Sequence, residues 1–135
     1  LTQEILRLCR EYGECRVEVE RMEEARRVKN ALESVCSMAR QRLDISDPAL
    51  LLALLDACEV TRDEGMLQEV LDVVGRNLDR LAVSVESVKL LACCYYYVEE
   101  EECAERARRM LEELRKLGMG EEELADAETI LEELT

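Results

Sequence analysis

Histidine, phenylalanine and tryptophan are absent from this chain of 135 residues, which also has one proline and five glycines. Without histidine, the sequence cannot form a Ser-His-Asp or Cys-His catalytic site or a zinc site of the Cys/His type. Apolar residues make up 48% and charged residues 37%, which leaves few of the uncharged polar side chains that line active sites. We therefore expect no enzymatic activity, no catalytic residues, and no site for a cofactor or a metal ion.

Positive charge is scarce as well, since 18 Lys and Arg face 32 Asp and Glu and the net charge is −14. Nucleic acids and anionic membranes bind through Lys and Arg, so we expect neither as a partner. The apolar run 49–55 is far shorter than the roughly 20 residues of a transmembrane helix. An acidic chain would instead attract a basic protein. The chain starts at Leu1 rather than at methionine, and we expect that residues were removed from its start.

The seven cysteines show no pairing pattern, because their number is odd and no Cys-x-x-Cys occurs. This speaks against a disulfide framework. Adjacent Cys93 and Cys94 would point about 100° apart on a helix and are poorly placed to bind one metal ion. Four others fall on apolar helical stripes, and we expect them to pack as small apolar side chains in a reducing compartment. These four are Cys9, Cys36, Cys58 and Cys103.

Apolar residues recur every three to four positions along much of the chain, which is the period of an amphipathic helix. These stripes lie in 5–12, 22–43, 66–82, 103–117 and 124–134. Two further segments, 50–58 and 88–98, are apolar on wide faces, so we expect buried helices with neighbours on two sides. The patterns predict an all-α fold in which antiparallel helical hairpins stack as a short α-solenoid or an irregular helical bundle.

An internal repeat supports this organisation. A basic residue, Leu, any residue, an apolar residue and a small residue follow one another from Arg42, Arg80 and Lys116, at intervals of 38 and 36 residues. That period fits one helical hairpin with its turns. We expect a single helical domain, 1–135, with three hairpin units and a terminal helix. The units are 1–45, 46–83 and 84–119, and the terminal helix is 121–134.

Short polar motifs mark where helices begin and end. Asp47 before Pro48, Asp63 and Ser84 each suit the N-cap of a helix. Gly118 suits a helix C-terminus, where glycine accepts a left-handed backbone. The predicted connections are therefore short.

Two segments leave alternatives open. In 15–21, Cys15, Val17 and Val19 alternate with charged residues, which fits a strand but also an irregular or helical lead-in. No glycine or proline interrupts 86–116, so one long helix competes there with a hairpin. Both questions concern how helices are connected rather than the fold class.

Three consecutive tyrosines, Tyr95, Tyr96 and Tyr97, form the main aromatic cluster. On a helix they would cover most of the circumference, so we expect at least one to be exposed and available to contact a protein partner. Packing between helices is the alternative for all three. The glutamate runs at 99–102 and 121–123 are expected to be solvated turns and helix starts.

The spacing of Ala107, Leu111 and Leu114, followed by Gly118-Met119, is similar to the second helix and closing turn of pentatricopeptide-type repeats. The likeness to tetratricopeptide repeats is looser. Both families are stacks of helical hairpins. The resemblance implies an adaptor that binds a basic or helical protein partner within a larger, organellar assembly.

This resemblance covers 43–120 and has one clear departure. The first-helix positions that contact bases in pentatricopeptide proteins fall near Ala53 and Leu91, which are apolar. Together with the net charge of −14, this departure argues against RNA as the partner.

The composition also resembles that of computationally designed helical proteins. Glutamate outnumbers aspartate by 25 to 7, and Asn, Gln and Pro are rare, as in sequences chosen for helix propensity. Seven cysteines and 15 Arg to 3 Lys depart from that style. This second resemblance implies a folded scaffold without a natural biochemical role, which we expect as the function, and the adaptor implied by the repeats is the alternative.

Overall fold

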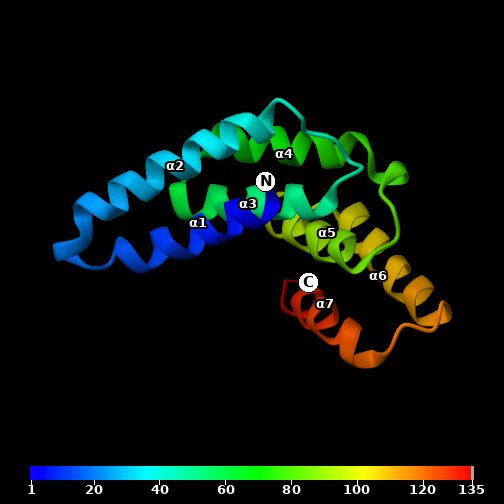
Figure 1. The fold of residues 1–135 in the computed structure, drawn as a ribbon. Coiled ribbons are helices and arrows are strands. Elements are labelled where there is room, and N and C mark those ends of the chain that lie inside the picture. The colour runs from blue at the N-terminus through cyan, green and yellow to red at the C-terminus, as the bar shows by residue number, and fades with distance from the viewer. Residues whose placement is uncertain (135) are drawn as a thin grey trace.

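The computed structural model describes residues 1–134, and this range is helical almost throughout and contains no β-strand (Figure 1). Within it lie seven α-helices and two 3-10 turns, η1 (Val19–Arg21) and η2 (Leu78–Arg80). The α-helices are α1 (Thr2–Cys15), α2 (Met22–Arg40), α3 (Pro48–Thr61), α4 (Glu64–Arg76), α5 (Val85–Val98), α6 (Glu101–Lys116) and α7 (Glu121–Leu134). The predicted all-α fold class is confirmed.

The helices are arranged in two rows. In the first row α1, α3, α5 and α7 each contact the next one along, although each pair is separated in the sequence by another helix. In the second row α2 packs on α1 and α3, α4 on α3 and α5, and α6 on α5 and α7 (Figure 1). Consecutive helices thus form hairpins that stack against one another, as the periodicity predicted.

The two helices with wide apolar faces, α3 and α5, lie in the middle of the first row. Four of their leucines are completely buried: Leu51, Leu54, Leu90 and Leu91 each have 0% exposure. Burying one leucine side chain contributes about 1.5–3 kcal/mol. These helices therefore form the centre of the hydrophobic core, and the prediction that they are buried is confirmed.

The repeat inferred from the sequence corresponds to equivalent positions in the second row. Leu32 on α2, Val70 on α4 and Ala107 on α6 are all 0% exposed. The residues four positions after each, which lie on the same helical face, are also buried. Each second-row helix thus presents the same register to the first row.

The predicted helix boundaries are confirmed. Asp47, Asp63 and Ser84 each accept the backbone N–H of the residue three positions later, at 3.2, 3.0 and 3.1 Å. Each bond satisfies an amide that the first helical turn leaves without a partner. At the end of α6, Gly118 has φ +89°, and the next amide donates back to the carbonyl of Leu114 at 3.1 Å. This is the Schellman stop that the glycine predicted.

The strand alternative for 15–21 is wrong. Cys15 is the last residue of α1 and is buried, a turn follows, and η1 leads directly into α2. Val17 and Val19, the other apolar members of the alternation, are 75% and 83% exposed. No neighbouring strand is available to pair with this segment, so its period of two has no structural role.

The segment 86–116 is a hairpin and not one helix. α5 ends at Val98 and α6 begins at Glu101. Between them Glu99 adopts a left-handed backbone with φ 52°, and its N–H donates to the carbonyl of Tyr95 at 2.7 Å. A non-glycine residue in this region costs about 1 kcal/mol, which the packing of α6 against α5 offsets.

Candidate functional site

The tyrosine run lies in the last turns of α5, and its members have different surroundings. Tyr96 is 60% exposed, whereas Tyr95 and Tyr97 are half-buried. Tyr95 donates its hydroxyl to Glu101 at the start of α6, at 3.4 Å. That contact places Tyr95 at the α5–α6 turn, so the structure separates it from the other two.

Tyr97 joins α5 to α3. Its hydroxyl donates to Oε2 of Glu59, 38 residues away in the sequence, at 2.8 Å. Burial, followed by the Glu59 carboxylate, raises the pKa of Tyr97 above its usual range. The Tyr96 and Tyr97 rings meet edge to face, with centroids 5.2 Å apart and an interplanar angle of 75°. The exposed ring of Tyr96 thus rests on an anchored neighbour.

Asp56 lies on α3 one turn before Glu59, and its negative charge acts on the thiols of Cys93 on α5 and of Cys9 on α1. Desolvation, followed by the negative charge of Glu59, raises the pKa of Asp56. Burial raises the pKa of the Cys93 thiol, and the negative charge of Asp56 raises it further. Within residues 1–134, no Lys or Arg forms an ion pair with Asp56 or Glu59. Two carboxylates therefore share this surface without an ion pair, and Arg16 and Arg62 line a hollow together with Glu59.

These residues define one surface, which we name the α3–α5 face. It consists of Asp56 and Glu59 from α3 and of Cys93, Tyr96 and Tyr97 from α5. Tyr96 and Tyr97 lie three and four positions after Cys93, so each shares a helical face with it. The face combines an exposed aromatic ring, a half-buried ring and two carboxylates that form no ion pair within residues 1–134.

Sequence reasoning singled out the tyrosines but missed both carboxylates. A signal was present, because Asp56 and Glu59 are the only charged residues in α3, a helix of 14 residues. Charges on a helix that is otherwise apolar mark the strip that faces solvent. The sequence alone could not show that Glu59 accepts a hydrogen bond from Tyr97 where α3 contacts α5.

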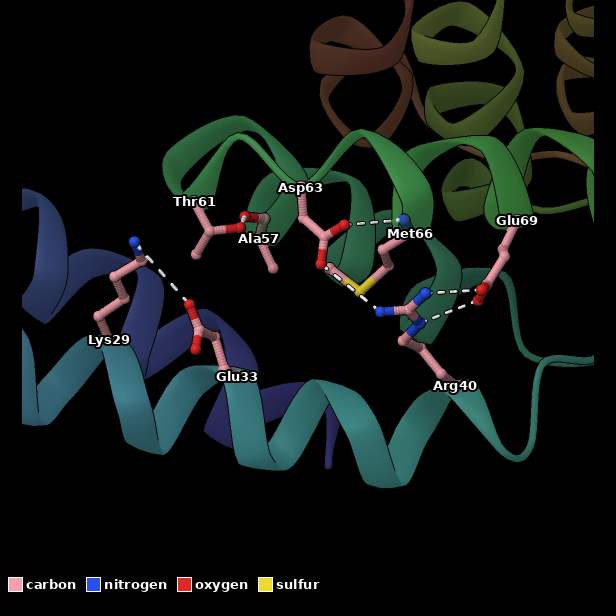
Figure 2. A network of polar contacts seen from close by, with 8 residues as sticks. All are labelled: Lys29, Glu33, Arg40, Ala57, Thr61, Asp63, Met66 and Glu69. Carbon is pink, nitrogen blue, oxygen red and sulfur yellow. Dashed lines mark hydrogen bonds and ion pairs between the residues drawn. The ribbon is translucent and has the colours of Figure 1, made fainter.

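A second pair of carboxylates lies at the junction of α2 and α4, and it has a different environment (Figure 2). Arg40 of α2 donates two hydrogen bonds to Glu69, at 2.9 and 2.6 Å, and lies 3.5 Å from Asp63. The bonds to Glu69 raise the pKa of Arg40 and lower that of Glu69. Asp63 also caps α4 through Met66. This network connects two helices, and its guanidinium pairs with both carboxylates.

The cysteines are all free, and six of the seven are buried. Burial raises the pKa of Cys9 and of Cys58 to about 12 and that of Cys36 to about 11. The thiolate is the nucleophilic form, so these thiols are unreactive at neutral pH. Cys93 differs from the other six cysteines because it is only half-buried, on the α3–α5 face.

Two kinds of site were sought across the described part of the chain. No group of three or more Cys, Asp or Glu in residues 1–134 is arranged to hold a metal ion. Among the helices of the same range, none is both long and apolar enough to cross a membrane. Comparison of the chain with family models, with curated proteins and with solved structures found no match.

Proposed function

We propose that this chain is a non-enzymatic helical-repeat adaptor that binds a protein partner through the α3–α5 face. Stacked helical hairpins present one row of helices as an extended surface, and repeat proteins bind their partners there. Here α3 and α5 are the central members of such a row. The proposal takes up the adaptor expected from the repeat pattern and assigns it a surface.

The observation that carries this proposal is the exposed ring of Tyr96 on a rigid support. Interface hot spots are enriched in tyrosine, because its ring offers a large contact area at a small cost in conformational entropy. The ring of Tyr96 packs against Tyr97, which is bonded to Glu59 on the neighbouring helix. On the same two helices, Leu54 and Leu91 are 0% exposed. A partner would therefore meet a surface that is already ordered.

The alternative of a designed scaffold without a partner is less well supported by the backbone. Arg62 and Glu99 have φ 58° and 52°, in the left-handed region where designers place glycine. Val17 and Val19 are exposed apolar residues of the kind that design removes. These features favour a chain shaped by selection for something other than stability.

The proposal can be tested with a photo-cross-linking aromatic residue placed at Tyr96. The matched control places the same group at Met38 on α2, since the two side chains are 60% and 58% exposed. We expect a discrete protein adduct from cell extract at position 96 and none at position 38. Equal adducts at both positions, or no adduct at either, would overturn the proposal, and the second result would favour a scaffold without a partner.

A further inference from the structure

The α3–α5 face carries an exposed aromatic ring and two carboxylates that form no ion pair within residues 1–134, although Arg16 and Arg62 line a hollow with Glu59. We infer that it is a receptor for an arginine side chain of the bound protein, whose guanidinium stacks on Tyr96 and pairs with Glu59 and Asp56. This inference rests on the proposed protein-binding function and specifies the chemistry of the partner. It follows from charge complementarity and from two contacts that the molecule already makes elsewhere.

The first argument is electrostatic. Asp56 and Glu59 are one helical turn apart, and no cation of residues 1–134 pairs with either. Like charges at this spacing disfavour each other, and partial desolvation weakens the hydration that would offset the repulsion. A cation brought by a partner would remove this cost. Binding energy is thus available to a basic segment and not to a neutral or an acidic one.

The second argument is that the chain itself shows how such carboxylates are satisfied. At the α2–α4 junction, Arg40 donates two hydrogen bonds to Glu69 and lies 3.5 Å from Asp63 (Figure 2). One guanidinium thus serves two carboxylates. The α3–α5 face offers two carboxylates without the guanidinium.

The third argument selects arginine over lysine. Tyr96 leaves much of its ring open to solvent, and a guanidinium both stacks on an aromatic ring and pairs with carboxylates through a planar fork. The same stacking occurs within the chain, where the guanidinium carbon of Arg16 lies 5.8 Å from the centroid of the Tyr12 ring. An ammonium group is more strongly hydrated and lacks the planar fork, so we expect lysine to bind less well.

The inference is tested with a short helical peptide that carries two arginines one turn apart in an otherwise uncharged sequence. Two matched peptides replace arginine by lysine or by uncharged citrulline. Binding is followed by amide chemical shifts of α3 and α5 in the isotope-labelled full chain. We expect saturable shifts on these helices, a lysine peptide that binds about 2- to 5-fold less tightly, and no binding of the citrulline peptide.

Variants of the protein show which side chains bind the arginine peptide. We expect Tyr96→Ala to weaken arginine binding about 2- to 5-fold and to abolish the preference over lysine, whereas Tyr96→Phe retains both. Glu59→Gln should weaken binding, and Glu33→Gln on α2, which changes the net charge equally, should not. Equal losses from Glu59→Gln and Glu33→Gln would show diffuse attraction to an acidic protein and would overturn the inference, as would equal binding of the citrulline peptide.

The two proposals fail in different ways. If the cross-linker at Tyr96 captures a protein but the arginine peptide produces no saturable shifts on α3 and α5, the adaptor function stands and the arginine receptor does not. If position 96 gives no adduct and the peptide does not bind, both are overturned. Each variant is first compared with the parent chain by thermal unfolding, so that a loss of binding is not mistaken for a loss of fold.

Discussion

Two pairs of carboxylates in this molecule have opposite environments. At the α2–α4 junction, Asp63 and Glu69 share Arg40, and the pKa of Glu69 is lowered by its hydrogen bonds to that guanidinium. On the α3–α5 face, Asp56 and Glu59 form no ion pair within residues 1–134, and desolvation raises the pKa of Asp56. Asp and Glu side chains thus stabilise the folded state at the α2–α4 junction and destabilise it on the α3–α5 face.

This difference indicates what each surface is for. The α2–α4 junction is satisfied within the chain, so it holds two helices together and offers little to a partner. The α3–α5 face keeps an electrostatic cost in the folded state and exposes an aromatic ring beside it. Sites that bind a ligand often retain such a cost, because the ligand relieves it.

The largest expected effect is a loss of stability, and it compares a leucine of α5, which carries the α3–α5 face, with a leucine of α4, which carries the α2–α4 junction. Leu91→Ala on α5 removes a fully buried side chain, and we expect it to lower the free energy of unfolding by about 2–5 kcal/mol. Leu71→Ala on α4 affects a half-buried side chain and should cost clearly less. Urea unfolding measures both, with Leu117→Ala as control, because Leu117 is 78% exposed. Equal losses at Leu91 and Leu71 would contradict the central position assigned to α5.

The next test removes the cation that distinguishes the two carboxylate pairs. We expect Arg40→Ala to lower the free energy of unfolding by about 1 kcal/mol, through the lost ion pairs and the lost packing of its stem. The matched control is Arg26→Ala, whose single pair with Glu23 is more exposed and lies within one helix. The control should change stability very little. If both variants unfold at the same urea concentration, Arg40 does not tie α2 to α4.

Much of the fold could be predicted because its determinants are local in the sequence. Asp47, Asp63 and Ser84 cap the helices that they precede, and those bonds span three residues. The wide apolar faces of α3 and α5 likewise marked them as buried without any knowledge of their neighbours. Periodicity and capping act within a few turns of helix, so a single sequence contains them.

The unpredicted features depend on contacts between distant segments. Glu99 ends α5 without glycine or proline, because the packing of α6 on α5 outweighs the cost of its left-handed backbone. The hydrogen bond from Tyr97 to Glu59 joins residues 38 positions apart. The tyrosines could therefore be named from the sequence, but their acidic neighbours could not. The role of Tyr95, Tyr96 and Tyr97 in binding a partner stays a prediction.

A smaller effect is expected in the pH dependence of stability, with opposite signs for the two pairs. Folding raises the pKa of Asp56, so its ionised form costs stability at neutral pH, and Asp56→Asn should make the protein more stable there. Folding lowers the pKa of Glu69, so its ionised form contributes stability above the unfolded-state pKa of about 4.3, and Glu69→Gln should make the protein less stable.

Both differences should shrink on acidification. The gain in Asp56→Asn decreases as pH falls through the raised folded-state pKa and is gone below the unfolded-state pKa of about 3.9. The loss in Glu69→Gln disappears as pH falls through the lowered folded-state pKa. Urea unfolding of both variants and the parent chain at a series of pH values measures this. Differences of the same sign at neutral pH would show that the two pairs are not opposites.

The smallest expected effect addresses whether the Tyr97 hydroxyl compensates Glu59 as Arg40 compensates Glu69. The neutral hydroxyl donates one hydrogen bond at 2.8 Å to a carboxylate, and that carboxylate remains exposed to water, which weakens the bond's net contribution. We therefore expect Tyr97→Phe to lower the free energy of unfolding by only about 0.5 kcal/mol, less than Arg40→Ala. Tyr95→Phe, which removes a longer bond of 3.4 Å to Glu101, is the matched control and should cost no more. A loss in Tyr97→Phe as large as that in Arg40→Ala would mean that the α3–α5 face is already satisfied by its own hydroxyl, and the argument for an external cation would fail with it.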